Sequence, residues 1–528
     1  MVAPFIAANA RKTLFTALLD ASAKHGPAKP ILEDVERQPL TYSRLIIGSL
    51  VLGRALAKVT ARKETVGIML PNVAGMPVVL FGLNAYGRVP ALLNFSAGAK
   101  SLQSSIGTGV IKTLITSRRF IATAGLEAIV ATLAEIDVSA GKKLTIIYLE
   151  DIRNAIGAPQ KLAGAIKSKF AHRIHARHAL SPDQAAVVLF TSGTEGAPKG
   201  VVLTNTNLVS NATQIYAHAD GLLSPADTVL NPLPMFHSFG LTAAALMPLL
   251  SGMKTVLYPS PLHYKQIPAL IADTKATVLF ATDTFLQGYA RAAGPDELKS
   301  LRYIIAGAER VKDNTRALYA KHGTTILEGY GATECAPVLA CNLPGRDKAG
   351  SVGLMLPGIE HRLEPVEGID GGGRLVVRGP NVMAGYMLAD KPGVLVPPTG
   401  GWHDTGDIVD IDDAGLVSIK GRAKRFAKIG GEMISLAAVE TMVTSLWPGS
   451  NHVVISLPDP RKGEQLVLVT DKPEADRTAL QGQARQEGIP ELWVPKSVLI
   501  VDQIPVLASG KVDFMATHDM VKSMRPQV

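Results

Sequence analysis

Apolar runs and amphipathic segments alternate along much of the chain. The short apolar and β-branched runs predict buried strands at residues 66–70, 89–93, 113–116, 144–149, 255–258, 277–280 and 303–305. Apolar residues spaced three and four apart predict helices at 12–24 and 73–86, and another that begins at 40–42. The first helix should end at Gly26-Pro27. This alternation predicts an α/β fold with mostly parallel sheets, helices on both faces and ligands beyond the carboxyl ends of the strands.

One pair of apolar runs differs from the rest, because residues 186–190 and 201–203 are joined by the ten residues TSGTEGAPKG. Two short strands around such a segment predict a hairpin. Its three glycines let backbone N–H groups face an anion, and its hydroxyls and lysine add donors, which suits a polyphosphate. A solvated Gly/Ser turn is the alternative, and the complete string disfavours it. The segment is not a kinase-type phosphate loop, because Pro198 and Gly200 occupy positions where that pattern requires Gly and Ser or Thr.

The chain has 528 residues, which is too long for one core, so at least two domains are expected. Its content of 47% hydrophobic and 19% charged residues is typical of a well-packed globular protein. The formal net charge of +9 would suit nucleic acid, an anionic membrane or an acidic protein. Because no Arg/Lys-rich run is interleaved with aromatic residues, we do not expect nucleic acid binding.

Cellular location is indicated by the cysteines and by the longest apolar run. Cys335 and Cys341 are the only cysteines. They could form a disulfide, but two buried thiols in a reducing cytosol is the preferred interpretation. The run at 239–250 is shorter than the roughly 20 residues that a membrane span requires. With no signal peptide recognisable, we expect a cytoplasmic protein that is at most peripheral at the inner face of the membrane.

Further candidate site residues follow other predicted strands. The loops 307–309 and 328–334 contain Gly, Tyr, Thr and Glu, which can stack a base, bond a phosphoryl oxygen and ligate Mg²⁺. His237, in the turn 234–240, could be a core histidine or a substrate-side group. His178 and Asp183 match an acyltransferase H-x4-D pattern, which we attribute to chance because the surrounding sequence is absent.

The string at 191–200, together with these loops, resembles the signature of the acyl-adenylate-forming superfamily, which includes acyl-CoA synthetases, firefly luciferase and nonribosomal adenylation domains. The string departs from the family pattern at Glu195, where Thr is usual. The resemblance implies ATP and Mg²⁺ as cofactors. It assigns the ATP/AMP-binding positions to Thr191, Ser192, Gly193, Thr194, Lys199, Gly307, Ala308, Glu309, Glu328, Gly329, Tyr330, Thr333, Asp407, Arg422 and Lys511.

More specific roles follow from the same resemblance. Catalytic positions are Lys511, Thr191, Glu334 and His237. Tyr330 would pack on adenine, Thr333 would contact the α-phosphate and Glu334 would bind magnesium. Asp407 would bind the ribose, and Arg422 the ribose or phosphate; the alternative for Arg422 and its basic neighbours is a solvated face. Lys424 would be the hinge, and Gly430, Gly431 and Glu432 would form the thiol-side loop.

The resemblance covers nearly the whole chain and implies an adenylate-forming domain over residues 1–423 and a small mobile α+β domain over 424–528. The segments 257–264, 326–330 and 422–428 look like the synthetase half of the bacterial bifunctional 2-acylglycerophosphoethanolamine acyltransferase/acyl-ACP synthetases. This resemblance implies that a fatty acid, expected to be long-chain, is converted to acyl-AMP and then to a thioester, with acyl carrier protein preferred over coenzyme A. The alternatives are a fatty acyl-CoA ligase, a ligase for another carboxylic acid and a nucleotide-binding scaffold without turnover.

Overall fold

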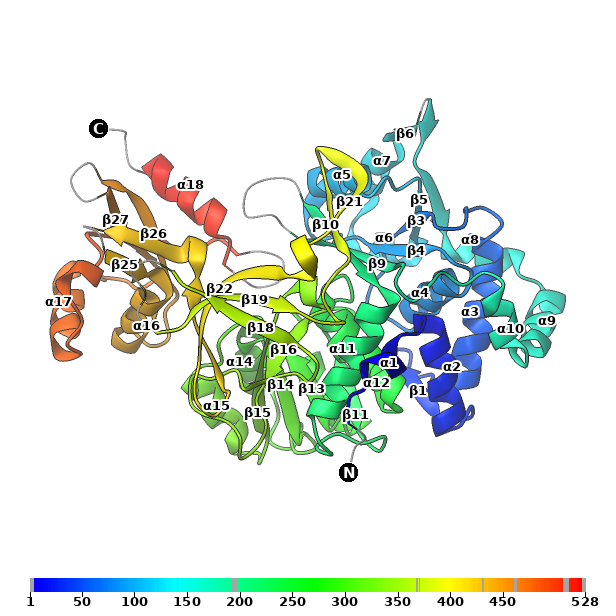
Figure 1. The fold of residues 1–528 in the computed structure, drawn as a ribbon, viewed down its shortest axis with the longest axis horizontal. Coiled ribbons are helices and arrows are strands. Elements are labelled where there is room, and N and C mark those ends of the chain that lie inside the picture. Colours follow the sequence, from blue (N-terminus) through cyan, green and yellow to red (C-terminus); the bar gives the residue numbers. More distant parts are fainter. Residues whose placement is uncertain are drawn as a thin grey trace. The chain divides into compact units, whose positions relative to one another are not determined.

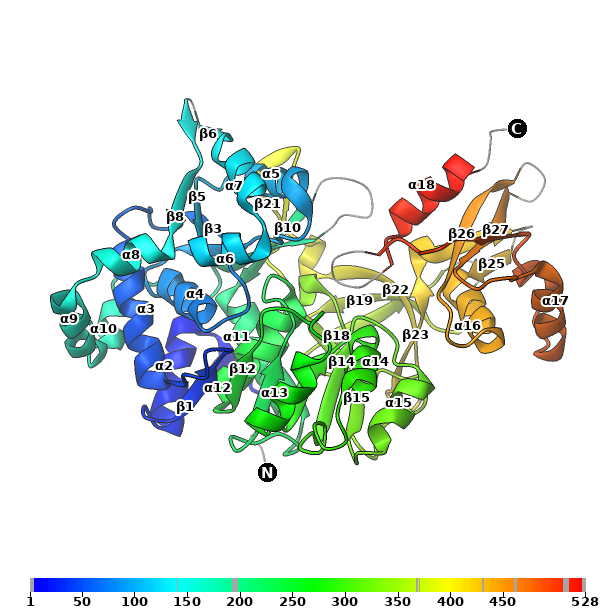
Figure 2. The same cartoon turned by 180° about the vertical axis from the view of Figure 1, so that it is seen from behind.

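The computed structural model describes residues 4–139, 141–191, 198–366, 369, 371–429, 432–459, 463–506 and 512–524. The chain forms two compact units (Figures 1 and 2). The first unit comprises residues 1–347, 353–360 and 378–403, and the second comprises 348–352, 361–377 and 404–528. The predicted boundary at 423/424 lies within the second unit. This boundary marks where the mobile segment is expected to begin. A division into compact units does not test movement, so the boundary stays a prediction.

A nine-stranded sheet in the first unit has the order β17-β16-β15-β14-β13-β11-β12-β1-β2. The neighbours from β15 to β1 are parallel, whereas β2, β16 and β17 are antiparallel additions at the two edges. The strands are β1 (Pro30–Glu33), β2 (Leu40–Thr41), β11 (Thr228–Asn231), β12 (Lys254–Leu257), β13 (Val278–Ala281), β14 (Tyr303–Gly307), β15 (Thr325–Gly331), β16 (Val338–Cys341) and β17 (Leu354–Met355).

Helices cover both faces of this sheet, as expected for a largely parallel sheet. One face, turned to the viewer in Figure 2, carries α13 (Gln266–Thr274), α14 (Asp283–Ala292) and α15 (Asp313–Ala320). The other, turned forward in Figure 1, carries α11 (Asn205–His218) and α12 (Met247–Ser251). Every residue of β13 is buried, which explains its uninterrupted apolar sequence.

An eight-stranded sheet completes the first unit, with the order β21-β20-β10-β9-β4-β3-β5-β8. Its strands are β3 (Thr65–Ile68), β4 (Val89–Leu92), β5 (Thr113–Thr116), β8 (Thr145–Tyr148), β9 (Ala185–Thr191), β10 (Lys199–Thr204), β20 (Gly385–Leu388) and β21 (Lys391–Val396). The strands β9 and β10 are antiparallel and confirm the predicted hairpin. β10 also pairs with β20, which arrives from far along the chain.

The three predicted helices, at 12–24, from 40–42 and at 73–86, correspond to α2, α3 and α4. Thr13 and Thr41 cap the first two long helices by accepting hydrogen bonds from backbone N–H groups. Gly26, with φ of 97°, ends the first of them. The helices are α1 (Ala7–Ala10), α2 (Leu14–His25), α3 (Tyr42–Leu56), α4 (Gly75–Ala85), α5 (Gly98–Thr108), α6 (Arg118–Ala124), α7 (Glu127–Ala134), α8 (Leu149–Ala155), α9 (Ala158–Ser168) and α10 (Ala171–Ala176); β6 (Asp137–Ser139) and β7 (Lys142–Lys143) form a small separate hairpin.

The second unit contains two antiparallel-rich sheets. The four-stranded sheet consists of β18 (Glu360–Glu364), β19 (Gly373–Arg378), β22 (His403–Ile411) and β23 (Val417–Arg422). The five-stranded sheet consists of β24 (Phe426–Ile429), β25 (Glu432–Ser435), β26 (His452–Asp459), β27 (Gly463–Thr470) and β28 (Ser497–Ile500). Its helices are α16 (Leu436–Leu446), α17 (Arg477–Gln486) and α18 (Phe514–Met524). The small α+β segment expected near the end of the chain is therefore present.

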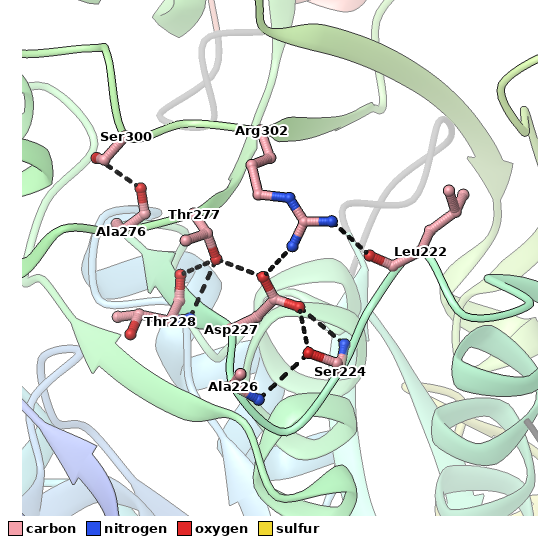
Figure 3. A network of polar contacts seen from close by, with 9 residues as sticks. All are labelled: Leu222, Ser224, Ala226, Asp227, Thr228, Ala276, Thr277, Ser300 and Arg302. Atoms are coloured by element: carbon pink, nitrogen blue, oxygen red, sulfur yellow. Dashed lines mark hydrogen bonds and ion pairs between the residues drawn. The ribbon is translucent and has the colours of Figure 1, made fainter.

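A polar network holds the amino-terminal edge of the nine-stranded sheet (Figure 3). The buried carboxylate of Asp227, just before β11, accepts hydrogen bonds from the backbone N–H of Ser224 at 2.8 Å and from the Thr277 hydroxyl at 2.7 Å. Arg302, just before β14, donates to the same carboxylate at 2.8 Å and to the carbonyl oxygen of Leu222 at 3.3 Å. One carboxylate thus ties together the starts of three neighbouring strands, at the edge opposite the predicted ligand side.

Candidate active site

The carboxyl edge of the nine-stranded sheet gathers most of the predicted site residues of the first unit. The turn with His237 follows β11, the loop 307–309 ends β14, and the loop up to Glu334 follows β15. The ends of β14 and β15 are held in register by the pair Gly307–Gly329. Ala308 adopts a left-handed conformation with φ of 70°, which turns the chain sharply after β14. These loops lie beyond the carboxyl ends of parallel strands, which is where the ligand is expected.

The centre of this edge is the carboxylate of Glu334, in the short 3-10 turn Thr333–Cys335. Its Oε1 accepts a 2.7 Å hydrogen bond from the hydroxyl of Tyr386 on β20. Its backbone oxygen accepts a 2.7 Å hydrogen bond from the N–H of Met383. Burial and the negative charge of Glu334 raise the pKa of Tyr386 well above its ordinary value, so this phenol stays a donor at neutral pH.

Tyr386 also reaches the predicted phosphate hairpin. The ammonium nitrogen of Lys199, at the start of β10, lies 5.3 Å from the centroid of the Tyr386 ring. Lys199 is directly opposite Thr191 across the hairpin. One aromatic side chain therefore contacts both the predicted phosphate-binding lysine and the predicted metal-binding carboxylate, a connection that sequence reasoning missed.

The residues around Glu334 fit a magnesium ion of the kind that ATP carries. Among the described residues, no group of three or more His, Cys, Asp or Glu side chains is arranged to hold a metal. Mg²⁺ is commonly bound through one or two carboxylates, with substrate phosphates and water completing its shell. The half-buried carboxylate of Glu334 is therefore a suitable single protein ligand.

Thr333 and the His237 turn lie close together. The hydroxyl of Ser238 donates a 3.3 Å hydrogen bond to the hydroxyl of Thr333. His237 is half-buried beside the ring of Phe236, with the ring centroids 4.7 Å apart. This turn leads into a π-helix, Phe239–Leu246, where the sequence showed only an apolar run. Departures of this kind are frequent at functional sites.

The turn after β11 is tightly folded at Gly240. A Cβ atom at this position would lie 2.4 Å from the backbone oxygen of Pro234. The backbone oxygen of Gly240 also accepts a 3.0 Å hydrogen bond from Asn231, the last residue of β11. Glycine is therefore required here, and it holds the His237 turn against the end of its strand.

Two of the predicted nucleotide-binding carboxylates already have protein partners. Glu328 accepts a 2.7 Å hydrogen bond from the N–H of Val311 and forms an ion pair with Arg316. Glu309 accepts hydrogen bonds from the N–H and hydroxyl of Thr284, at 3.0 and 2.9 Å, at the start of α14. These contacts give both side chains a role in holding their loops, and their contact with nucleotide stays a prediction. Tyr330 is buried, and its contact with adenine likewise stays a prediction.

In the second unit, the two predicted ribose-side residues are neighbours. Asp407 on β22 and Arg422 on β23 are directly paired across the sheet. Nε of Arg422 lies 3.0 Å from Oδ1 of Asp407; the aspartate side chain is 6% exposed and the arginine side chain 61%. The hydroxyl of Thr405 accepts a hydrogen bond from the backbone N–H of Asp407 at 3.1 Å. The ion pair with Arg422 orients the carboxylate of Asp407, and its contact with the ribose stays a prediction.

Several predicted positions lie outside the described residues: Ser192, Gly193, Thr194, Gly430, Gly431 and Lys511. Lys424 lies in the 3-10 turn Ala423–Arg425, and the exposed Glu432 begins β25. Their predicted roles as hinge and thiol-side loop stay predictions.

Arg425, one of the basic neighbours of Arg422, does not lie on a solvated face. Its side chain is 18% exposed and pairs with Glu440 at 2.7 Å. The guanidinium also donates to the backbone oxygen of Val454 and lies 3.9 Å from the centroid of the Phe514 ring. Burial raises the pKa of Glu440, and Arg425 opposes that shift. Arg425 is therefore a largely buried structural cation.

Both cysteines are free thiols, so the disulfide alternative is excluded. Burial raises the pKa of Cys341 to about 12, which makes its thiol unreactive at neutral pH. Asp183 forms an ion pair with Arg11 at 2.5 Å and accepts a hydrogen bond from Thr206. The ring of His178 instead lies beside Tyr86, with centroids 5.1 Å apart. These separate partners agree with a chance match to the acyltransferase pattern.

Comparison with known proteins identifies the class to which this fold and site belong. Residues 19–387 match the family described as AMP-binding enzyme, so the chain belongs to that family. A long-chain-fatty-acid–CoA ligase of Escherichia coli O157:H7 is 26% identical over 477 residues, covering 85% of this chain and 84% of that protein. A sulfoacetate–CoA ligase of Cupriavidus necator is 28% identical over 519 residues, covering 94% of this chain and 96% of that protein.

Solved structures show the same fold. The ATP-bound crystal structure of MatB from Rhodopseudomonas palustris superposes with a TM-score of 0.79 at 24% identity, covering 97% of this chain and 99% of that one. The fold is therefore that of the acyl-CoA synthetases, including the small carboxyl-terminal part. Family membership and these relatives support an AMP-forming acid–thiol ligase. None of the described helices is long and apolar enough to cross a membrane.

Proposed function

We propose that this chain uses ATP to convert a fatty acid to an acyl-adenylate and then transfers the acyl group to a phosphopantetheine thiol. The observation that carries the proposal is the arrangement of Lys199, Tyr386 and Glu334 at the carboxyl edge of the nine-stranded sheet. This arrangement supports the proposal because it combines a cation suited to phosphate with a carboxylate suited to Mg²⁺, beside the predicted phosphate hairpin.

In the first step, a carboxylate oxygen of the acid attacks the α-phosphorus of ATP. The bond from that phosphorus to the bridging oxygen breaks, and pyrophosphate leaves. Lys199 would neutralise phosphate charge, and the hydroxyl of Thr333, held by Ser238, would donate to the α-phosphate. Glu334 would hold Mg²⁺, which neutralises charge on the phosphate oxygens. The protein mainly positions the reactants and stabilises charge in such a step.

In the second step, the thiol sulfur attacks the acyl carbonyl carbon, AMP leaves and the thiol proton is released to solvent. For the second unit, the proposal keeps Asp407 and Arg422 as ribose and phosphate ligands. It also keeps Lys511 as the lysine of the first step, Lys424 as the hinge and residues 430–432 as the thiol-side loop. These assignments rest on the family resemblance.

A fatty acid is the proposed substrate because a long-chain-fatty-acid–CoA ligase is among the relatives that cover most of the chain. The sulfoacetate–CoA ligase covers even more of it, so a different acid is the competing proposal. Exchange of labelled pyrophosphate into ATP, measured with fatty acids of increasing length, aromatic acids and sulfoacetate, distinguishes them. We expect the longest fatty acids to give the fastest exchange, and Glu334→Gln to abolish exchange with every acid.

Three other outcomes of this assay have distinct meanings. Fastest exchange with a short or aromatic acid would keep the adenylation proposal and replace the substrate. Exchange with no acid would favour the nucleotide-binding scaffold. If Glu334→Gln exchanged pyrophosphate as fast as the wild type, the assignment of Glu334 as the metal ligand would be wrong.

Acyl carrier protein is the proposed preferred acceptor, as the resemblance to acyl-ACP synthetases implies. Coenzyme A is the second candidate, and the two relatives described above, both named as CoA ligases, favour it. Comparing kcat/KM for the two thiols with one acid tests the choice.

A further inference from the structure

The helix α9 exposes an apolar stripe on the surface of the first unit. Leu162 and Ile166 are spaced four residues apart, so they lie on one side of the helix, and Phe170 follows two residues after its end. Their exposed fractions are 65, 56 and 53%, among the largest of the apolar side chains in the described residues. Figures 1 and 2 both show α9 at an outer edge of this unit, next to α3 and α10. Three large apolar side chains are thus presented together.

The opposite side of α9 is fixed against α3. Gly164 is buried there, and a Cβ atom at this position would lie 2.1 Å from Cγ2 of Val51. The close approach of the two helices depends on this glycine and sets the rotation of α9 about its axis. Leu162 and Ile166 therefore cannot turn into the core, because that side of the helix is already occupied by α3.

The segment that contains α9 is basic. Residues 152–182 contain six Lys or Arg and no Asp or Glu: Arg153, Lys161, Lys167, Lys169, Arg173 and Arg177. The side chains of Lys167, Lys169, Arg173 and Arg177 are exposed. Within the part of the chain that the structure describes, none of these four forms an ion pair. Elsewhere on this unit, exposed cations such as Arg11 and Arg118 pair with carboxylates.

We propose that the α9 surface, defined as Leu162, Ile166, Phe170, Lys167, Lys169 and Arg173, docks on an anionic phospholipid bilayer. An amphipathic helix with apolar side chains on one side and lysines beside them lies in the plane of such an interface. The apolar side chains enter the boundary between headgroups and acyl chains, and the cations bind the anionic headgroups. At about 1.5 Å per residue, the 11-residue helix is about 16 Å long, roughly half of what spanning the hydrocarbon core requires.

A bilayer suits this surface better than a protein partner. The apolar side chains project from an outer helix, and fluid lipid accommodates projecting side chains without a complementary pocket. An acidic protein would satisfy the cations but would need a matched apolar groove. The inference goes beyond the proposed reaction, because it depends on neither the acid nor the thiol.

Cosedimentation of the full chain with lipid vesicles tests the proposal. The vesicles are phosphatidylcholine alone or phosphatidylcholine mixed with phosphatidylglycerol. We expect binding to the mixed vesicles that weakens with salt, and much weaker binding to the neutral ones. The double variants Ile166→Gln/Phe170→Gln and Lys167→Glu/Lys169→Glu should each reduce the partition coefficient about tenfold or more.

Two single-residue controls separate this surface from non-specific vesicle binding. Ile500→Gln changes an apolar side chain of similar exposure, 52%, in the second unit, and Lys321→Glu reverses an exposed lysine at the end of α15. Both should bind vesicles like the wild type. Because all of these side chains are exposed, the variants should keep the wild-type melting temperature and pyrophosphate-exchange activity.

A label at the stripe gives a second, independent readout. Ile166→Cys can be labelled selectively with an environment-sensitive fluorophore, because Cys335 is fully buried and Cys341 is unreactive. The emission should shift to the blue with mixed vesicles. No vesicle binding by the wild type, equal binding by the double variants, or an unshifted label would overturn the proposal. Loss of self-association or of carrier-protein binding in the variants, with vesicle binding unchanged, would assign the surface to that partner instead.

Discussion

The hydroxyl of Tyr386 donates a 2.7 Å hydrogen bond to the carboxylate of Glu334, although the two residues are 52 positions apart. The contact exists because β20 pairs with β10 and so places Tyr386 beside the loop that follows β15. The ring of Tyr386 also lies 5.3 Å from the ammonium nitrogen of Lys199. One side chain therefore orients the proposed metal ligand and contacts the proposed phosphate ligand.

Tyr386→Phe should lower the rate of pyrophosphate exchange about 10- to 100-fold, because a hydrogen bond to a charged group is worth about 1.5–3 kcal/mol. The ring contact with Lys199 is retained, so the loss isolates the hydroxyl. If the hydroxyl positions Glu334, the variant should also need more Mg²⁺ for half-maximal exchange. Tyr148→Phe, on the edge strand β8, is the matched control. A lowered melting temperature with an unchanged Mg²⁺ dependence would mean that Tyr386 is only structural.

Lys511→Ala should abolish acyl-adenylate formation but leave thioester formation from supplied acyl-AMP largely intact. The prediction follows from the family resemblance, in which this lysine bridges carboxylate and α-phosphate. Losing one donor that stabilises developing charge commonly costs about 10²–10³-fold. The two half-reactions are measured separately, by pyrophosphate exchange and by thioester formation from acyl-AMP. Equal damage to both would show that the assigned role is wrong.

Lys424→Pro should have the opposite effect and slow thioester formation more than adenylation. Proline fixes φ, and the proposal requires the backbone to rotate at this residue between the two steps. The same pair of half-reaction assays measures the effect. Unchanged rates in both would place the hinge at another residue.

Asp227→Ala should destabilise the fold without affecting the chemistry of the folded enzyme. The buried carboxylate accepts from Ser224, Thr277 and Arg302, and its removal leaves these donors without their acceptor (Figure 3). We expect a loss of about 2–4 kcal/mol in the free energy of unfolding. Arg302→Ala should cost about 1 kcal/mol or less, because the arginine is 49% exposed. Urea unfolding measures both, and equal costs would contradict the central role of Asp227.

The sequence predicted those parts of the fold and site that depend on local signals. The strand at 113–116 matches β5, and the helix at 12–24 matches α2, because burial on both faces and capping residues are visible within a few positions. The loops at strand ends were located for the same reason. The neighbouring positions of Asp407 and Arg422 then follow from the pairing of β22 with β23.

What the sequence did not predict depends on contacts between distant segments. Tyr386 has no local signal that points to Glu334, and Arg425 lies in a basic run whose burial by Glu440 and Phe514 appears only in the fold. The stripe on α9 has the spacing of a core-facing helix. The exposed fractions of its side chains and the close packing of Gly164 against Val51 show that the stripe faces outward.

An experiment on the choice of thiol acceptor needs an exposed basic residue. Arg425 is unsuitable, since reversing the charge of a largely buried cation would damage the fold. Lys428, on β24, is exposed and is two residues from the predicted thiol-side loop. Carrier proteins are acidic, so a cation near the thiol entrance should increase their association rate, and salt screens such attraction over about 8–10 Å. Coenzyme A is also anionic, but its small size lets it contact fewer cations at once.

Lys428→Glu should therefore lower kcat/KM for acyl carrier protein several-fold more than for coenzyme A, and the difference should shrink as salt rises to about 0.3 M. Lys522→Glu, an exposed lysine on α18, makes the same change in net charge and is the matched control. If the effect on the carrier protein exceeds that of the control only at low salt, electrostatic docking of the carrier protein near Lys428 is supported. A preference for coenzyme A that neither substitution alters would instead favour an ordinary fatty acyl-CoA ligase, because a small thiol ligand does not depend on an extended basic surface.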